Sequence, residues 1–359
     1  MISAKYGGSF FTNQADSPST ITAPDEETET IARHLTEFLR GEVREGRLTN
    51  SLAPLQSGIG SVSNAVFHGF LESEFTDLKV YSEVLQDAVF ELMDAGKVSF
   101  ASCCSITLSA AKMDQVFPDL EKYRDRLILR PQEISNHPEV IRRMGLIAIN
   151  TALEFDIYGN VNSTHVMGTQ MMNGIGGSGD FARNARIAIF VTKSIAKEGN
   201  ISCIVPFVSH VDHTEHDVDV VVTEQGYADL RGLAPRERAQ LIIERCAHPM
   251  YREPLLEYYN EALTRGGQTP HVLEKKRCLG IRITRSTEQC FRRFCKEDKE
   301  NRQDDLFLTV LFLVLVHTFF SHVRLSRRAL WRCTAGCQTP FVYTGRTAFV
   351  SAARSIYCG

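Results

Sequence analysis

The first 275 residues contain few cysteines, and none of them stands at the spacing of a metal site or of a disulfide framework. The four are Cys103, Cys104, Cys203 and Cys246. Cys103 and Cys104 are adjacent in an apolar stretch of small residues, so we expect them to be reduced core residues. This pattern favours an intracellular, reducing setting.

The sequence also lacks the features of a targeting segment. Its first residues have no long apolar run and no cleavage-site pattern, which argues against a secretory signal peptide. A mitochondrial presequence is rich in Arg, whereas the first Arg here is Arg33. We therefore expect a cytoplasmic protein, with mitochondria as the alternative.

Internal repeats and extreme composition are absent as well. With 43% hydrophobic and 23% charged residues, the chain is not collagen-like, fully disordered or a many-span membrane protein. Its 359 residues are long enough for two or three domains and a sizeable core.

The net charge of −3 conceals two unlike segments. Residues 1–275 carry 25 Lys and Arg against 37 Asp and Glu, whereas residues 276–359 carry 15 against 6. The second segment also holds six of the ten Cys and the one Trp. We expect an irregular N-terminal segment over 1–24, a folded domain over 25–275 and a basic, Cys-rich, atypical tail over 276–359.

Within that tail, residues 306–323 are almost continuously apolar. As a helix, this segment would span about 27 Å at roughly 1.5 Å per residue, which is the lower limit for crossing a membrane. Acids precede the segment and several Arg follow it, so an inserted segment would have its C-terminal side in the cytoplasm. Membrane contact through residues 306–323 is therefore the alternative to a soluble chain.

Strand and helix signals alternate along residues 25–275. Apolar residues at helical spacing after Pro24 and Asp25 predict a first helix, which Gly46 ends. Short apolar runs predict strands at 52–55, 78–83, 98–104, 127–129, 146–157, 185–192, 201–208 and 218–223. Further helices are predicted at 84–95, after Pro138, and at about 235–246 and 253–264, with a hairpin turn at 197–200. This alternation is typical of an α/β domain with a largely parallel or mixed sheet.

Glu83 stands at the carboxyl end of one predicted strand, directly before a predicted helix. Open α/β sheets place their sites at this edge, and the N–H groups of a helix N-terminus stabilise negative charge there. A carboxylate can act as a nucleophile and form an anhydride or an ester. The alternative is a solvated Glu that begins a helix.

Two glycine-rich loops could bring backbone N–H groups close to a ligand. Gly58-Ile59-Gly60 joins a strand to a helix, as in anion and oxyanion sites, although tight turns also use glycine for steric reasons. Residues 174–179 hold four glycines, a composition that is costly in entropy for a passive connection. This second loop matches neither a Walker A loop nor a dinucleotide fingerprint, so a ligand loop and a plain loop are both open.

Three further polar positions are candidate functional residues. Residues 209–217 contain three His and three acids between two predicted strands, but at no recognised metal-ligand spacing, which favours a hydrogen-bonded turn over a metal site. Glu224 is another acid at a strand end. Asn136, before Pro138, is either an amide donor or a simple helix cap.

Taken together, these motifs resemble the acetyl-CoA hydrolase/transferase family, which comprises acetyl-CoA hydrolases and succinyl-CoA:acetate CoA-transferases. The resemblance covers about residues 12–275 and rests on six motifs in the same order. They are Leu55-Gln56-Ser57-Gly58-Ile59-Gly60 with Asn64-Ala65-Val66, Tyr81-Ser82-Glu83-Val84-Leu85-Gln86-Asp87, Ser135-Asn136-His137-Pro138, Gly176-Gly177-Ser178-Gly179-Asp180-Phe181, His210-Val211-Asp212-His213-Thr214-Glu215-His216-Asp217 and Thr223-Glu224-Gln225-Gly226-Tyr227-Ala228-Asp229-Leu230. The resemblance implies an α/β three-layer sandwich of the CoA-transferase (sugar-phosphate-isomerase-like) type, and it marks the His-rich turn as structural.

The resemblance also implies roles for the matching residues. Glu83 is the expected catalytic nucleophile, which forms an acyl-glutamyl anhydride and then a glutamyl-CoA thioester. The expected oxyanion and substrate-binding residues are Ile59, Gly60, Asn136, Gly177 and Glu224, and the expected CoA-binding residues are Gly176, Gly177 and Gly179. The implied substrates are an acyl-CoA and a carboxylate such as acetate. We expect a homo-oligomer and no metal, redox cofactor or nucleic-acid partner.

One departure from the family affects the expected function. Family members carry another α/β domain before the helix that begins near residue 25, and this domain contributes part of the substrate site. Residues 1–11 do not resemble it, so we expect the C-terminal catalytic half only, followed by a tail unlike the family's short ending. The expected function is acetyl-CoA hydrolysis or CoA transfer in acetate metabolism, and the two reactions are not separated. The alternative is a catalytically inactive, truncated remnant that binds CoA or pairs with a full-length homologue.

Overall fold

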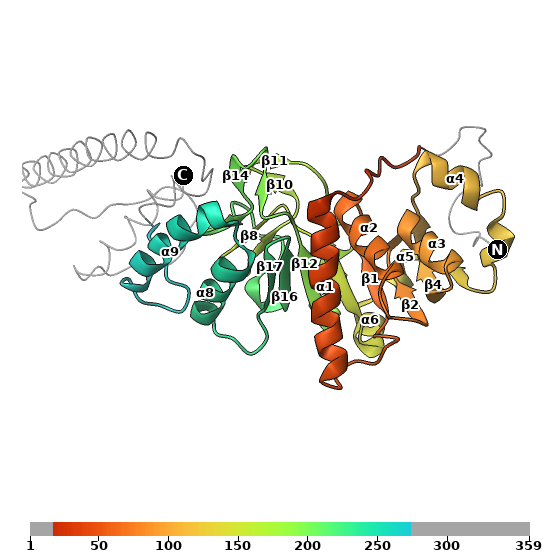
Figure 1. Ribbon diagram of the computed structural model, residues 1–359, viewed down its shortest axis with the longest axis horizontal. Coiled ribbons are helices and arrows are strands. Elements are labelled where there is room, and N and C mark those ends of the chain that lie inside the picture. Colours follow the sequence, from red (N-terminus) through yellow and green to blue (C-terminus); the bar gives the residue numbers. More distant parts are fainter. Residues whose placement is uncertain (1–16, 274–359) are drawn as a thin grey trace, which may run out of the picture. The chain divides into compact units, whose positions relative to one another are not determined.

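The computed structural model describes residues 17–273, which all lie within one compact unit (Figure 1). The predicted irregular segment is described only from residue 17, and the predicted tail, with its apolar segment 306–323, lies outside the described residues. Among the helices of residues 17–273, none is both long enough and apolar enough to cross a membrane.

An eight-stranded sheet forms the centre of this unit. Its strands lie in the order β17-β16-β12-β7-β1-β2-β4-β6, and all neighbours are parallel except β16 and β17. The strands are β1 (Leu55–Ser57), β2 (Leu78–Tyr81), β4 (Val98–Cys103), β6 (Leu127–Leu129), β7 (Ile147–Thr151), β12 (Ile187–Val191), β16 (Val220–Thr223) and β17 (Gly226–Asp229). Most residues of β7, β12 and β16 are apolar and buried, as expected for strands of a parallel sheet that helices cover on both faces.

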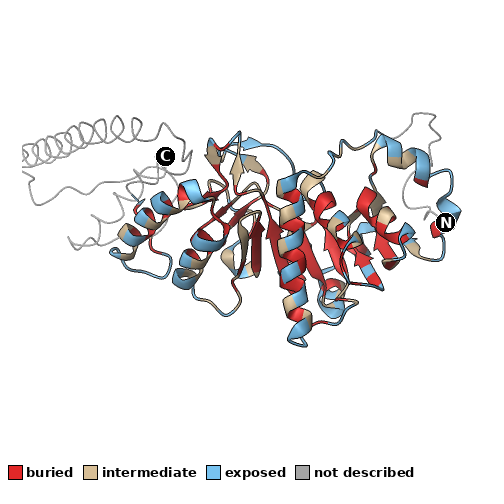
Figure 2. Cartoon of the chain, in the orientation of Figure 1, coloured by how far each residue is buried: buried red, intermediate tan, exposed pale blue. Residues whose placement is uncertain are grey.

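Helices cover both faces of the sheet, and this confirms the predicted three-layer α/β class. On one face, Ile147 and Ile149 of β7 share a core with α1 (Glu26–Arg44), α2 (Ser61–His68) and α3 (Asp87–Asp94). On the other face, Ala148 packs with α6 (Pro138–Met144) and α7 (Ser178–Asn184), and Phe190 of β12 packs with α8 (Pro235–Cys246) and α9 (Pro249–Leu263). Figure 2 shows the buried strands between helices whose outer faces are exposed.

The first helix shows how local sequence signals set an element. The Asp25 carboxylate accepts a hydrogen bond from the Thr28 N–H at 2.9 Å, and the Thr28 hydroxyl completes a capping box. Ile31 and Leu35 are fully buried on the face that packs on the sheet. The predicted helix is confirmed.

Several shorter strands and helices lie outside the eight-stranded sheet. Four small groups of strands and two further helices are present among the described residues: β3 (Val84–Leu85) with β5 (Ser105–Ile106), β10 (His165–Val166) with β11 (Gln170–Met171), β13 (Ile195–Ala196) with β14 (Ile201–Ser202), β8 (Glu154–Asp156) between β9 (Val161–Asn162) and β15 (Ile204–Val205), and the helices α4 (Ala110–Val116) and α5 (Gln132–Ser135). Short 3₁₀ helices occur at Gly69–Leu71, Leu120–Tyr123 and Glu215–Asp217. The turn predicted at 197–200 joins β13 to β14.

Several predicted boundaries were wrong. The strand predicted at 52–55 is β1 at Leu55–Ser57, because Leu52 has a positive φ of 54° that ends extended backbone. The helix predicted from residue 84 begins at Asp87, because residues 84–85 pair with β5 instead. The strand predicted at 146–157 is divided into β7 and β8. The helix predicted at about 253–264 begins earlier, at Pro249, because the His248 side chain caps it by accepting a hydrogen bond from the Met250 N–H.

The cysteines of the described residues are free thiols. Cys103 is buried, as predicted, and burial raises the pKa of its thiol to about 12. Cys104 is half-buried rather than a core residue. A thiol with so high a pKa carries almost no thiolate at neutral pH, so Cys103 is chemically inert.

Candidate active site

A cavity lies at the point where the order of the strands reverses. The chain runs outward from β1 through β2, β4 and β6, and then returns to β7 on the other side of β1. Ligands of open α/β sheets bind outside the carboxyl ends of the strands at such a point. A cavity of about 530 Å³ occupies this position, and its walls include residues that follow β1, β2 and β7 and the loop before α7.

Glu83 contributes its side chain to this cavity from the connection between β2 and β3. Its backbone carbonyl accepts hydrogen bonds from the N–H groups of Cys104 and Ser105 at 2.9 and 3.0 Å, which fixes the main chain at the sheet edge. The half-buried carboxylate accepts a long hydrogen bond of 3.4 Å from the Gln132 amide. It forms no ion pair with a basic side chain of residues 17–273, so its negative charge faces the cavity unneutralised.

The loop before α7 lies directly on the Glu83 carboxylate. A Cβ atom on Gly177 would overlap Oε2 of Glu83 and would lie 2.5 Å from Nδ2 of Asn136. The φ of Gly177 is an ordinary −81°, so the close approach, and not the backbone conformation, requires glycine here. The Gly177 N–H has no acceptor among the described residues, and it lies in the cavity wall beside the carboxylate.

Asn136 lies against Gly177 but does not itself line the cavity. Its side chain is 7% exposed, and neither its amide oxygen nor its amide nitrogen has a hydrogen-bond partner in the described part of the chain. Buried amides are nearly always satisfied, so an orphaned amide beside a carboxylate marks Asn136 as a candidate functional residue. The structure thus places Asn136 with Glu83 and Gly177.

The Gly58–Gly60 loop offers one backbone donor rather than two. Gly60 has a φ of 106°, and its N–H donates to the Gln86 side-chain oxygen at 2.9 Å. The Ile59 N–H has no acceptor within residues 17–273, and its side chain is 62% exposed at the cavity. Of the two predicted oxyanion donors in this loop, Gly60 is therefore already engaged and Ile59 is available.

Gln86 holds this loop in place, and replacing it tests the contact. We expect Gln86→Met to lower the free energy of unfolding by about 1 kcal/mol, because methionine keeps the buried stem but leaves the Gly60 N–H without its acceptor. Urea unfolding followed by circular dichroism measures the change. Gln132→Met, at an exposed amide with a 3.4 Å contact, is the matched control and is expected to change stability by less than about 0.5 kcal/mol. Equal effects of the two substitutions would contradict the assignment.

Two residues from the predicted set lie elsewhere. Gly179 is in the first turn of α7, and a Cβ there would meet Ile175 Cδ1 at an ordinary 3.7 Å, whereas Gly176 lies in the cavity wall. Glu224 follows β16, and its carboxylate accepts hydrogen bonds from the N–H and hydroxyl of Ser194 and from the Gln225 amide. Glu224 thus anchors the segment before β13 and is not among the residues that line this cavity.

Two polar residues that line the cavity were not predicted from the sequence. Gln56 of β1 and Asn150 of β7 exchange two hydrogen bonds through their amides, at 3.1 and 3.0 Å, across adjacent strands. Each is a buried amide, and Asn150 directly follows the apolar run Ile147–Ile149, which is the signal that could have found it. Both residues line the cavity together with Ile59.

His213 is the buried member of the His-rich segment. Its ring packs 4.7 Å from that of Phe190, and its Nε2 lies 3.2 Å from the hydroxyl of Ser178, a residue of the cavity wall. Burial lowers the pKa of His213 to about 4, so the ring is neutral at physiological pH. The structural role implied for the His-rich turn stays a prediction.

Sequence comparisons relate this chain to known proteins. Residues 114–259 match the family model described as acetyl-CoA hydrolase/transferase C-terminal domain. Succinyl-CoA:acetate CoA-transferase of Clostridium kluyveri is 57% identical over 265 residues, which are 74% of this chain and 49% of that protein. Acetyl-CoA hydrolase of Schizosaccharomyces pombe is 50% identical over 258 residues, which are 69% of this chain and 50% of that protein. The chain therefore spans about half the length of the curated relatives it matches.

Solved structures agree with the sequence comparisons. RipA from Yersinia pestis superposes with a TM-score of 0.59 at 25% identity, over 69% of this chain and 56% of that one. A 4-hydroxybutyrate CoA-transferase from Porphyromonas gingivalis superposes with a TM-score of 0.53 at 25% identity, over 70% of this chain and 59% of that one. The family model, the relatives near 50% identity and the shared fold confirm the resemblance: the chain carries the C-terminal domain of the acetyl-CoA hydrolase/transferase family.

Proposed function

We propose that this chain cleaves the thioester of acetyl-CoA or succinyl-CoA through Glu83 and passes the CoA to acetate or the acyl group to water. The observation that supports this most strongly is the Glu83 carboxylate in the cavity at the strand-order reversal, which has no ion-pair partner among residues 17–273 and has Gly177 packed on it. The named relatives act on acetyl-CoA or exchange succinyl-CoA with acetate, which supplies the substrate class.

In the proposed reaction, a carboxylate oxygen of Glu83 attacks the thioester carbonyl carbon. The C–S bond breaks, and CoA leaves as a thiolate from an acyl-glutamyl anhydride. The thiolate then attacks the glutamyl carbonyl carbon, the acyl group leaves as a free carboxylate, and Glu83 carries CoA as a thioester. An acceptor carboxylate reverses these steps to give a new acyl-CoA, or water hydrolyses the thioester and regenerates Glu83. The reaction requires no metal or redox cofactor.

Each attack passes through a tetrahedral oxyanion, which backbone N–H groups stabilise. Ile59 and Gly177 line the same cavity as Glu83, and their N–H groups have no acceptor among the described residues. One correctly aimed donor in such a site contributes about 10²- to 10³-fold to kcat. The Asn136 amide has no hydrogen-bond partner in the described part of the chain and lies against Gly177 together with the Glu83 carboxylate, so its proposed role is to orient that carboxylate.

A CoA-release assay with adduct trapping tests the proposal. We expect thiol release from acetyl-CoA or succinyl-CoA, and faster acyl exchange when acetate is added if transfer predominates. Hydroxylamine or borohydride is expected to trap the activated carboxyl, and peptide mass spectrometry is expected to place the modification on Glu83. Binding of CoA without thiol release or modification would instead support the inactive remnant. The expected homo-oligomer and the cytoplasmic or mitochondrial location stay predictions.

A further inference from the structure

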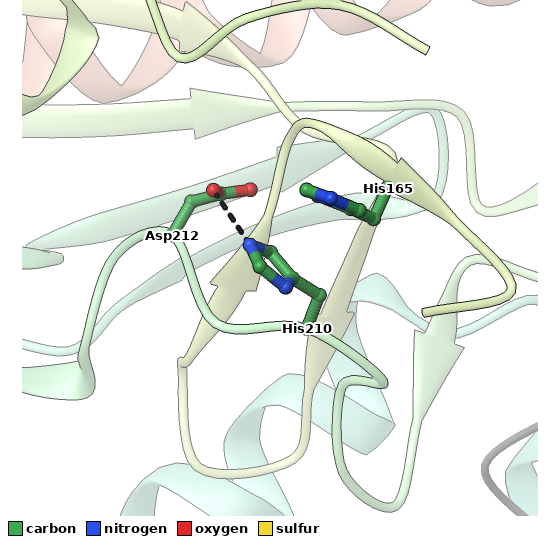
Figure 3. A group of neighbouring side chains, drawn as sticks. All are labelled: His165, His210 and Asp212. Atoms are coloured by element: carbon green, nitrogen blue, oxygen red, sulfur yellow. Dashed lines mark ion pairs between the residues drawn. The ribbon is translucent and has the colours of Figure 1, made fainter. Parts of the chain in front are cut away.

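Three side chains converge beside the cavity without a role in the proposed reaction. His165 begins β10, and His210 and Asp212 lie in the loop before the 3₁₀ helix Glu215–Asp217 (Figure 3). One nitrogen of each imidazole and one oxygen of the carboxylate all lie within 4.8 Å of one another. The two segments are far apart in sequence, so the fold, and not local spacing, brings the three groups together.

The distances within this cluster suit a small divalent ion. His210 Nε2 and Asp212 Oδ1 are 3.3 Å apart. Two ligand atoms on a tetrahedral Zn²⁺ ion, each bound at roughly 2.0–2.1 Å, are also separated by about 3.3 Å. The rings of His165 and His210 stack with centroids 3.8 Å apart and a tilt of 31°, so the two imidazoles lie side by side next to the Asp212 carboxylate.

Hydrogen bonds prepare two of the three groups for coordination. The Asp212 carboxylate accepts from the Ser163 N–H at 2.7 Å and from the Thr164 hydroxyl at 2.8 Å. A hydroxyl has one proton, so at 2.6 Å from His165 Nδ1 the Thr164 oxygen must act as the acceptor. Nδ1 of His165 then carries the hydrogen, and Nε2 keeps the lone pair that a metal needs. Such outer contacts are typical of metal-binding histidines and carboxylates.

We propose that His165, His210 and Asp212 bind one divalent transition-metal ion of the zinc class. Two imidazoles and one carboxylate select Zn²⁺, Co²⁺ or Ni²⁺ over Mg²⁺ and Ca²⁺, which prefer oxygen ligands alone. The ion would link β10 to the loop at residues 210–212, and Ser163, which donates to Asp212, lies in the cavity wall. The proposed role of the metal ion is to stabilise this part of the cavity wall. A structural ion of this kind does not depend on the proposed reaction.

Zinc binding to matched variants of the full chain tests this site. The chain is stripped with chelator, incubated with one equivalent of ZnCl₂ and passed through a desalting column, and retained zinc is measured by mass spectrometry. The wild type is expected to retain about one zinc ion more than His210→Ala. His216→Ala is the control, because His216 belongs to the same segment but is 76% exposed and outside the cluster. All variants keep the same cysteines, so the difference reports the cluster alone.

Two further measurements guard against a folding defect. Thr164→Val keeps all three ligands and is expected to weaken zinc affinity about 10- to 100-fold through the lost hydrogen bonds. X-ray absorption of the bound zinc in the wild type is expected to show nitrogen and oxygen neighbours. Equal zinc retention by the wild type and His210→Ala, or a shell of sulfur atoms only, would overturn the proposal.

Discussion

Glu83→Gln is expected to reduce acyl-CoA cleavage by at least about 10³-fold, because an amide has the shape of the carboxylate but cannot form the anhydride. The substitution keeps the side chain at the same place in the cavity and keeps an oxygen to accept from Gln132. Affinity for CoA is therefore expected to stay within a few-fold of the wild type. Steady-state thiol release and equilibrium binding of CoA separate the two quantities.

Glu133→Gln is the matched control for this substitution. Glu133 is an exposed carboxylate on α5, next to the residue that contacts Glu83, and it does not line the cavity. Its removal changes the net charge by the same amount and is expected to leave thiol release unchanged. Wild-type activity in Glu83→Gln, or an equal loss in both variants, would show that the chemistry does not pass through Glu83.

Local signals were enough to predict several elements of this fold. α1 follows from the Asp25 cap and the apolar spacing of Ile31 and Leu35, and α8 was predicted at its observed bounds of Pro235–Cys246. These features act within one or two helical turns, so the sequence contains all the information they need. The helix after Glu83 was predicted to begin too early. Val84 pairs with Ser105, which is far along the chain, and local sequence signals contain no information about such a long-range pairing.

Strand order explains why the two acids at strand ends have different surroundings. Glu83 follows β2 and Glu224 follows β16, and a sequence pattern cannot show how far apart those strands lie. The sheet places β1, β7 and β12 between them, which separates the two strand ends by about 19 Å at roughly 4.8 Å per strand. Glu224 consequently contacts Ser194, while Glu83 shares its cavity with the Ile59 and Gly177 loops.

Three-dimensional packing, by contrast, determines at which position of the loop at 174–179 only glycine fits. The sequence contains four glycines in this loop, but only Gly177 among them would place a Cβ atom in overlap with the Glu83 carboxylate and the Asn136 amide, whereas a Cβ on Gly176 would meet Oε2 of Glu83 at an ordinary 3.9 Å. At Gly179 a methyl group has ordinary contacts. A count of glycines therefore indicated a close approach, and the three-dimensional contacts identify where it occurs.

Gly177→Ala is expected to lower kcat by about 100-fold, because its methyl group must displace Glu83 or Asn136. A shift of about 1 Å in a reacting group costs on the order of 10²-fold in rate. The same crowding is expected to destabilise the fold by roughly 1–3 kcal/mol, so thiol release is measured well below the melting temperature of the variant.

Gly41→Ala separates crowding at the site from the general effect of adding a methyl group. Gly41 lies in α1, where a Cβ would meet only Arg44 Nη2 at 3.9 Å, and alanine there is expected to leave thiol release unchanged and to stabilise the helix by up to about 1 kcal/mol. Wild-type kcat in Gly177→Ala would contradict the close packing on Glu83. A reduced kcat with unchanged CoA affinity would place the effect on the reacting carboxylate, because the overlap involves Oε2 of Glu83 and not the open side of the cavity.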